Sequence, residues 1–399
     1  MTVSVSHLLE LDALAREEGR RHPMRRDLHA RLVDGAGRHF VGVLGPRGVG
    51  KTVLLKQLAS EVEGAVYLSA DTLGDWEIFD VVRQLHRDLG FTSFLLDEIH
   101  FAPGYDGQLK KVFDFLDVRV VFTSSVALAL AESAFDLARR VRIERLLPFS
   151  FREYLAFTRK ASLPRLTLAE IEARAWSREH LLHETEFDAY LRGGLMPFAL
   201  EEAEPLPLLE GILDKIVMRD APRVARITVD ELELLRKLLT FVGRSPVDGI
   251  NYSALSRNLG ITKYKAQAYV DLLCRAFVLQ IVLPRGANVL REPKVLMAVP
   301  YRLLFRDWDD AVGGLREDFF AEAMRFAGLE FDYLKTTRGA KTPDYLVRSD
   351  DGDFVVEIGG TGKGRSQFKG FWADRKLVFS HPGGFDGPRR PLYLLGFLA

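Results

Sequence analysis

The segment GPRGVGKT, from Gly45 to Thr52, constrains this chain more than any other stretch. It follows a short apolar run, Phe40 to Leu44, which predicts a buried parallel strand. Apolar residues then recur at helical spacing, so the loop lies between a strand and the N-terminus of a helix. The segment fits the pattern G-x-x-x-x-G-K-[S/T] at every fixed position. Because a helix N-terminus favours an anion, the segment predicts a loop shaped around a phosphate group.

The residue types of this loop are those that a bound nucleotide needs. The glycines let the backbone wrap closely around the phosphates, Lys51 is expected to reach the β- and γ-phosphates, and Thr52 is expected to hold Mg²⁺. The predicted ATP-binding residues are Gly45, Pro46, Arg47, Gly48, Val49, Gly50, Lys51, Thr52 and Val53. The alternative is a glycine-rich turn without a ligand, which the complete motif in this context disfavours.

A second predicted strand ends in two acids. In FTSFLLDEIHF the apolar residues are followed by Asp97 and Glu98. Asp97 is expected to accept hydrogen bonds from Mg²⁺-bound water, and Glu98 to orient and deprotonate the attacking water. Downstream of a phosphate loop, this pair implies hydrolysis and not only nucleotide binding.

A third predicted strand, VRVVFTSSVAL, ends in Thr123 and Ser124. An ATPase of this type has a residue that senses the γ-phosphate at this place, and Ser124 is our candidate; the alternative is an ordinary polar strand end. Arg139 and Arg140 are candidate arginine fingers, in cis or in trans, unless they form a solvated surface. Alternating strands and helices predict a doubly wound parallel α/β sheet.

Several of these segments together resemble a family of bacterial and archaeal AAA-type ATPases that carry a C-terminal domain of unknown function. The segments that carry the resemblance are GPRGVGKT, FLLDEIH, VVFTSS and RVRIERLLPFSFREYL, with YLRGGLMPFALEE, INYSALSRNLGITKYKAQAYVDLLCRAFVLQIV and REPKVLMAVPYRLLF downstream. The resemblance covers nearly the whole chain and implies that Lys51, Thr52, Asp97 and Glu98 are the ATPase residues. Members often have glycine before the arginine finger and before the sensor serine, and this chain lacks both glycines.

Farther along, the sequence predicts a helix-turn-helix with a wing. A helix from Ser253 to Leu259 is followed by a turn at Gly260 and by a second helix that begins near Lys263 and Lys265. These two lysines are candidate contacts to the backbone of double-stranded DNA. The alternatives are a module used only for packing and a solvated helix face.

The C-terminal residues resemble a restriction-endonuclease-like core, which has a Pro-Asp…Glu-x-Lys pattern. Asp344 and Glu357 match its acids, and Glu322 lies on the preceding predicted helix. Gly359 stands where the lysine belongs, and Lys363 is the candidate for a displaced lysine. Without a fixed cation beside the metal and the attacking water, we predict a degenerate site that does not cut DNA and instead serves for protein contact or self-association.

Composition narrows the classes of protein. The chain has 399 residues, 47% of them hydrophobic, which is enough for several domain cores. Its 55 basic and 55 acidic residues argue against a chain coated with nucleic acid, although a local basic patch is compatible with them. Cys274 is the single cysteine, which excludes a disulfide framework and a thiolate zinc site. With no apolar stretch of the roughly 20 residues that span a bilayer, we expect a cytoplasmic protein with no membrane partner.

The expected architecture is an α/β P-loop NTPase core followed by three further parts. The predicted domains are an AAA-type core with an N-terminal helical extension (1–150), a helical lid or connector (151–245), a winged helix-turn-helix (246–300) and a nuclease-like α+β domain (301–399). The expected function is Mg²⁺-dependent ATP hydrolysis that switches the C-terminal half, with DNA as one partner. The alternatives are a nucleotide-gated scaffold for proteins, which Glu98 disfavours, and an ATPase-regulated metal-dependent nuclease, which Gly359 disfavours.

Overall fold

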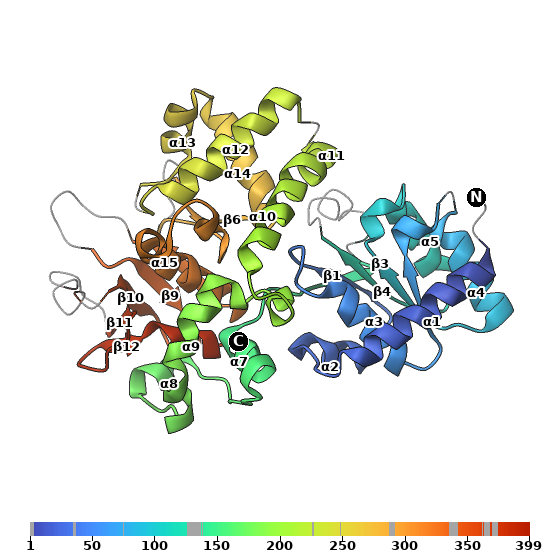
Figure 1. Cartoon of the computed structure of the whole chain (residues 1–399), viewed down its shortest axis with the longest axis horizontal. Helices are drawn as coiled ribbons and strands as arrows, with labels where there is room; N and C mark the ends of the chain where they lie inside the picture. Colours follow the sequence, from blue (N-terminus) through green and yellow to red (C-terminus); the bar gives the residue numbers. More distant parts are fainter. Residues whose placement is uncertain are drawn as a thin grey trace. The chain divides into compact units, whose positions relative to one another are not determined.

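The computed structural model separates the chain into two compact units, Met1–Pro148 and Phe149–Ala399 (Figure 1). This division lies close to the boundary predicted after residue 150. The residues described are 4–34, 37–74, 76–125, 137, 139–225, 227–247, 249–286, 292–334, 342–360, 362, 368 and 374–399. In these ranges no helix has the length and apolar character that crossing a membrane requires.

The first unit is built on a five-stranded parallel sheet with the strand order β2-β3-β4-β1-β5. Its strands are β1 (Phe40–Leu44), β2 (Ala65–Ser69), β3 (Ser93–Asp97), β4 (Arg119–Ser124) and β5 (Val141–Arg145). Every residue of β1 and β3 is buried, as expected for parallel strands covered on both faces. The α/β fold class predicted from the sequence is confirmed, and the parallel strands bring all carboxyl ends to one edge of the sheet.

Helices cover this sheet. They are α1 (Val5–Arg21), α2 (Asp27–Val33), α3 (Lys51–Glu61), α4 (Ile78–Leu89) and α5 (Tyr105–Phe115), with short turns η1 (Ala70–Thr72) and η2 (Ile99–Phe101). Helices α1 and α3 lie side by side, and α1 also runs along β2 (Figure 1). The Asp12 carboxylate of α1 accepts the N–H of Tyr67 at 2.7 Å, and Arg16 donates to the carbonyl of Ala65. The predicted N-terminal helical extension is thus bonded to the backbone of β2.

The second unit begins with the helices that the sequence predicts as a lid or connector. They are α7 (Phe151–Arg159), α8 (Leu168–Ala173), η3 (Arg178–His183), α9 (Glu184–Ala189), η4 (Tyr190–Gly194), η5 (Pro197–Leu200), α10 (Pro205–Lys215), η6 (Ile216–Asp220), α11 (Ala221–Ala225) and α12 (Val229–Arg244). The Phe151 ring packs edge-on against Phe397 at 5.6 Å, and the N–H of Leu166 donates to the Phe397 carbonyl at 2.9 Å. The first of these helices are therefore part of the C-terminal fold, and their role as a lid stays a prediction.

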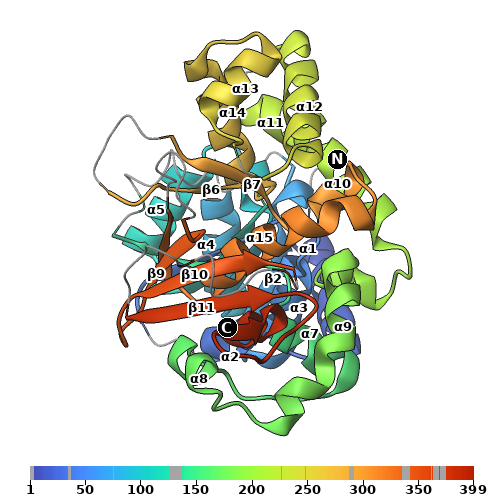
Figure 2. The same cartoon turned by 90° about the vertical axis from the view of Figure 1, so that its left-hand side faces the viewer.

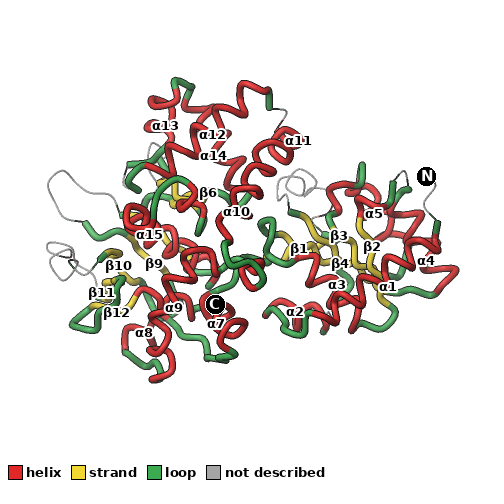
Figure 3. Tube along the Cα trace, in the orientation of Figure 1, coloured by secondary structure: helices red, strands yellow, loops and turns green. Residues whose placement is uncertain are grey.

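Helix α12 packs with α13 (Tyr252–Leu259), which packs with α14 (Lys263–Arg275), and the three helices lie together in Figure 3. The antiparallel strands β6 (Leu279–Val282) and β7 (Lys294–Met297) follow. The side chain of Thr262 caps α14 by accepting the N–H of Lys265 at 3.2 Å. The helices and strands follow one another in the predicted order, and the identity of this segment as a helix-turn-helix with a wing stays a prediction.

The C-terminal part is a mixed five-stranded sheet with the order β12-β11-β10-β9-β8, and β9, β10 and β11 lie side by side in Figure 2. Strand β10 is antiparallel to β9 and parallel to β11. The elements are η7 (Tyr301–Leu304), α15 (Trp308–Phe326), β8 (Glu330–Tyr333), β9 (Tyr345–Arg348), β10 (Phe354–Gly359), β11 (Arg375–Ser380), β12 (Arg389–Pro391) and η9 (Leu392–Phe397). Helix α15 packs against β10, and its Asp318 pairs with Arg302 of η7 at 2.6 Å, with both side chains buried.

Candidate nucleotide site

The predicted phosphate loop joins β1 to α3 through a backbone that only glycine adopts readily. Gly48 and Gly50 have φ angles of 82° and 86°, in the left-handed region. A Cβ on Gly45 would lie 1.9 Å from the carbonyl oxygen of Leu146, so no larger residue fits there. The glycines of the motif therefore shape a close turn at the N-terminus of α3, where backbone N–H groups and the helix dipole favour an anion.

Lys51 is the first residue of α3, and its ammonium group lies inside the loop. Its Nζ donates to the carbonyls of Gly45 and Pro46 at 2.9 and 2.8 Å, and the residue is only 6% exposed. A buried ammonium group that the loop carbonyls hold in place is consistent with a lysine that binds phosphate oxygens. Thr52 follows at the first turn of the helix, as predicted for a metal-holding hydroxyl.

Arg26 fixes the loop from the segment that precedes α2. Its guanidinium donates to the carbonyl of Val49 at 3.1 Å and to the carbonyl of Leu147 at 2.8 Å. The sequence analysis missed this residue, because its partners lie in two distant segments and its own surroundings carry no motif.

Asp97 ends β3 and is held by two hydroxyl groups. Tyr67 of β2 donates to its Oδ2 at 2.8 Å, and the Thr123 hydroxyl of β4 donates to its Oδ1. Burial, reinforced by the charge of Asp97, raises the pKa of Tyr67 far above its ordinary value, so its hydroxyl stays a donor. A carboxylate has about four acceptor positions, so two remain for water bound to Mg²⁺. The residues therefore fit the predicted metal role.

Glu98 lies directly after Asp97 in a left-handed conformation, with φ of 48°. For a residue other than glycine this backbone is uncommon and clusters at functional sites. Its N–H donates to the Thr123 hydroxyl at 2.9 Å. Its Oε2 accepts the Ser125 hydroxyl at 3.1 Å and lies 3.3 Å from Nδ1 of His100, while its Oε1 lies 3.8 Å from Arg47 of the phosphate loop. The predicted base therefore faces the loop.

Ser124, the predicted sensor, ends β4, which lies between β1 and β3 in the sheet. Its register partner on β1 is Leu44, the residue before the phosphate loop. The Ser124 hydroxyl lies 3.3 Å from Nδ1 of His100. The sequence-based prediction assigned no role to His100, which lies two residues after Glu98, or to Ser125, which directly follows Ser124.

The candidate fingers Arg139 and Arg140 stand before β5, at the other end of the strands. Strand β5 runs parallel to β1, with Val141 opposite Phe40 at their amino ends. At about 3.3 Å per residue, the length of the strand separates these arginines from the phosphate loop. Arg140 also forms a bidentate ion pair with Asp114, with N–O distances of 3.0 and 3.1 Å. The finger in cis is therefore wrong, and the finger in trans stays a prediction.

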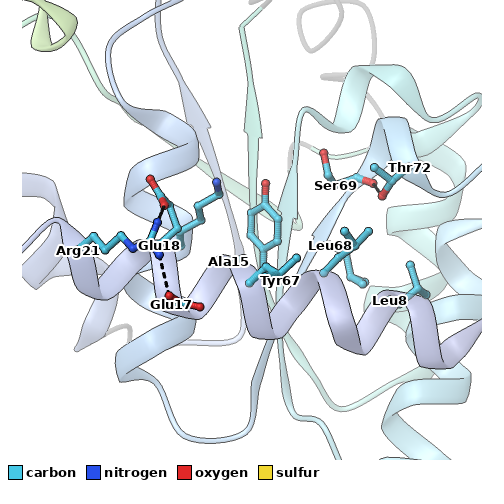
Figure 4. A pocket seen from close by; sticks show the side chains of 12 residues that line it. Leu8, Ala15, Glu17, Glu18, Arg21, Tyr67, Leu68, Ser69 and Thr72 are labelled. Atoms are coloured by element: carbon cyan, nitrogen blue, oxygen red, sulfur yellow. Dashed lines mark hydrogen bonds and ion pairs between the residues drawn. The ribbon is translucent and has the colours of Figure 1, made fainter. Parts of the chain in front are cut away.

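A cavity of about 330 Å³ lies on the other side of Tyr67 (Figure 4). It is lined by α1, by Lys56 of α3 and by Tyr67 to Ser69 with Thr72. The Tyr67 ring stands beside α1 with its hydroxyl directed away from that helix, toward Asp97 (Figure 4). No residue of the phosphate loop lines this cavity, so we place the nucleotide site by its chemistry, at the loop.

In the second unit, the predicted acids Asp344 and Glu357 come together. Oδ2 of Asp344 accepts the N–H of Ile358 at 2.7 Å, and Asp344 is half-buried whereas Glu357 is buried. Burial, and then the charge of Glu357, raises the pKa of Asp344 to about 8. Lys363 lies outside the described residues. Across the described ranges, no group of three or more His, Cys, Asp or Glu residues has the arrangement of a metal site.

The prediction that Glu322 joins these acids is wrong. Its Oε2 accepts the N–H of Val299 at 2.9 Å, and burial raises its pKa to about 8. Glu317 of the same helix acts on Asp344 instead and pairs with Lys294 of β7. Glu317 and Glu322 are five positions apart, which separates their directions by about 140° on a helix, so both cannot face one strand.

The two lysines predicted to contact DNA are both engaged in ion pairs. Lys263 pairs with Glu292 at 2.6 Å, and Lys265 pairs with Glu231 at 2.9 Å. The backbone N–H of Thr228, and then the Lys265 ammonium, hold the pKa of Glu231 below its usual range. The partner acids come from segments outside the helix-turn-helix motif, so the local sequence gave no sign of them.

Comparisons with known proteins bear on this assignment. Residues 37–155 match the family model of an AAA domain, and residues 184–301 match that of a domain of unknown function. An uncharacterized protein of Methanocaldococcus jannaschii is 26% identical over 378 residues, which are 84% of this chain and 78% of that protein.

Among solved structures, the RuvB Holliday junction branch migration motor of Thermotoga maritima is 20% identical, with 71% of this chain and 91% of that chain covered and a TM-score of 0.28. PCH-2 of C. elegans is 15% identical, with 67% and 69% covered and a TM-score of 0.25. The parallel sheet, its phosphate loop and the family models agree on the first part of the chain: residues 37–155 form an AAA-type P-loop domain, and residues 184–301 match a domain of unknown function.

Proposed function

We propose that this protein is a cytoplasmic, Mg²⁺-dependent ATPase whose nucleotide state switches its second unit. One observation carries the proposal: the carboxyl ends of β1, β3 and β4 bring the phosphate loop, Asp97, Glu98 and Ser124 to the same edge of the sheet. The Arg47–Glu98 contact joins the loop to the predicted base directly. A binding loop without catalysis would not need a carboxylate at that position.

Each group of the site has a distinct part in hydrolysis. The loop N–H groups and Lys51 hold the phosphates, and Asp97 and Thr52 are the residues that would hold Mg²⁺. When bound, the metal neutralises charge that develops on the phosphate oxygens. Glu98 takes a proton from water while the water oxygen bonds to the γ-phosphorus and the bond from phosphorus to the ADP oxygen breaks. Ser124 would meet the γ-phosphate oxygens.

Two substitutions and a control test this proposal in the full chain. Lys51→Ala should abolish ATP binding in a titration calorimeter, because it removes the charge that meets the phosphates. Glu98→Gln should keep ATP binding and lower turnover by about 10²–10⁴-fold, the usual effect of losing a general base. Glu77→Gln, at an acid whose side chain is 54% exposed, should change neither quantity. Turnover that Glu98→Gln leaves unchanged would refute the assignment.

Contact of α14 with the backbone of duplex DNA is a second part of the proposal. It is supported by the exposure of this helix start, where the Tyr264 residue is 84% exposed and the Lys263 side chain 52%. A DNA phosphate would have to replace Glu292 and Glu231 as partner of the two lysines. The Lys263→Ala/Lys265→Ala double variant should lower the slope of log affinity against log salt by about 0.9 per lost contact.

The matched control for DNA binding is Lys237→Ala on α12, which removes an exposed lysine from an ion pair of similar length, 2.8 Å. It should leave the salt dependence unchanged. A parent protein that binds no duplex at low salt would remove DNA from the proposal and leave a protein partner, or a second copy, as the target of the switch.

A further inference from the structure

His100 occupies a position that no motif assigns, between the predicted base and the predicted sensor. It lies on the short turn η2, directly after Asp97 and Glu98. Its Nδ1 is 3.3 Å from Oε2 of Glu98 and also 3.3 Å from the hydroxyl of Ser124. One ring nitrogen thus touches the residue at the end of β4 and the residue that follows β3.

The surroundings of His100 fix the ring. Its side chain is only 7% exposed, and its ring packs on Phe101 with 4.5 Å between the ring centroids. A buried ring held by packing presents its nitrogen in one direction, which a flexible surface side chain would not do. The Glu98 side chain is more open, at 22% exposure, so its carboxylate has room to turn unless something holds it.

The charge on Glu98 favours a proton on Nδ1, because a hydrogen bond to a carboxylate is stronger than one to a neutral hydroxyl. The ring then donates to Glu98, with the Ser124 oxygen beside the same N–H. Ser125 supplies a second donor to the same carboxylate oxygen at 3.1 Å. Together these groups leave Oε1 as the oxygen that faces Arg47 and the phosphate loop.

We propose that His100 is a positioning residue for ATP hydrolysis: it holds the Glu98 carboxylate in a fixed direction relative to Ser124. The inference rests on the proposed function, because Glu98 acts as a base only if ATP is hydrolysed. The role of His100 is nevertheless a separate claim, because Glu98 could act as a base without this contact. A misplaced base lowers the rate of the chemical step and leaves ATP binding intact.

The test compares kcat and KM for ATP in the full-length parent and in His100→Ala, His100→Asn and His100→Gln. Loss of a group that orients a catalytic residue typically costs about 10–100-fold, so His100→Ala should lower kcat by that factor and leave KM within about twofold. The amide nitrogen of asparagine takes the place of Nδ1, whereas that of glutamine reaches farther out. His100→Asn should therefore restore most of kcat, and His100→Gln should not.

The asparagine and glutamine variants keep a polar side chain in the same space, so their difference does not depend on how well the alanine variant folds. A second measurement places His100→Ala in a Glu98→Gln background. If His100 acts through Glu98, the double variant should turn over about as slowly as Glu98→Gln alone.

The outcomes separate the two ideas. A parent without ATP turnover, or with turnover that does not depend on Glu98, overturns the proposed function and this inference with it. A parent with Glu98-dependent turnover but unchanged kcat in His100→Ala overturns this inference alone. Equal kcat for His100→Asn and His100→Gln, or a full additional loss in the double variant, also overturns it.

Discussion

Replacing Tyr67 with phenylalanine removes a single hydroxyl group from a buried residue of the first unit. The ring of Tyr67 stays, so its packing between β2 and α1 is kept, and only the 2.8 Å hydrogen bond to Asp97 is lost. A hydrogen bond to a charged group contributes about 1.5–3 kcal/mol, and removing it leaves a buried carboxylate with one donor fewer. Tyr67→Phe should therefore lower the free energy of unfolding by about that amount.

The same substitution should weaken the metal site. Loss of a group that orients a metal-holding residue typically costs about 10–100-fold in metal affinity, so the Mg²⁺ concentration for half-maximal turnover should rise by that factor. Stability is measured by urea titration with hydrogen exchange of peptides from β2 and β3, which reports the first unit separately. Tyr264→Phe, at a residue that is 84% exposed, is the control. If Tyr67→Phe changes stability by less than about 0.5 kcal/mol and leaves the Mg²⁺ dependence unaltered, the reasoning about Asp97 is refuted.

Three further predictions concern backbone, charge and pH. Gly45→Ala should abolish ATP binding, because its Cβ would lie 1.9 Å from the Leu146 carbonyl oxygen; Gly107→Ala, in α5 with nothing within 4 Å, should be neutral or stabilising by up to about 1 kcal/mol. Arg302→Ala should cost about 3–5 kcal/mol in urea unfolding, because it leaves Asp318 charged and buried, whereas Arg236→Ala, at an exposed pair, should cost less than about 1 kcal/mol. The folded state holds the Glu322 proton more tightly than the unfolded chain, because burial raises the pKa of Glu322 from 4.5 to about 8. The contribution of this group to the free energy of unfolding is therefore fully present below pH 4.5 and is lost as the pH rises to about 8, by up to about 1.4 kcal/mol per pH unit. Glu322→Gln keeps an acceptor for Val299 and should flatten this slope; an unchanged slope would contradict the burial of an ionisable group there.

The sequence predicts those parts of the site whose residues lie close together along the chain. A strand, a glycine loop and a helix follow one another from Phe40 to Glu61, so their chemistry can be recognised locally. Asp97 and Glu98 end an apolar run and are recognised in the same way. Tyr67 and Arg26 act through contacts with segments far along the chain, and no local pattern marks them.

Helix α15 shows a different limit. Its residues from Asp318 to Met324 are all buried, so the alternation of polar and apolar residues that reveals a helix face is hidden. The direction of Glu322 could not be predicted for that reason, and Glu317, one turn earlier and half-buried, was overlooked. The ion pairs of Lys263 and Lys265 could not be predicted from the sequence either, because the acids that pair with them come from α12 and from the segment before β7.

The contacts of α1 with β2 also bear on how copies of this protein avoid joining through their sheets. On the outer side of the edge strand β2, the Asp12 carboxylate accepts a backbone N–H and the Arg16 guanidinium donates to a backbone carbonyl. These side chains of α1 thus make the hydrogen bonds that a neighbouring strand would otherwise make. A foreign strand could pair there only after displacing the helix. The other edge strand, β5, carries charged residues, among them Arg142 and Glu144, and charged side chains on an edge strand also oppose pairing with a foreign strand. A fragment of the first unit that begins at β1 would lose the protection given by α1, so we expect it to associate or precipitate where a fragment that keeps α1 does not.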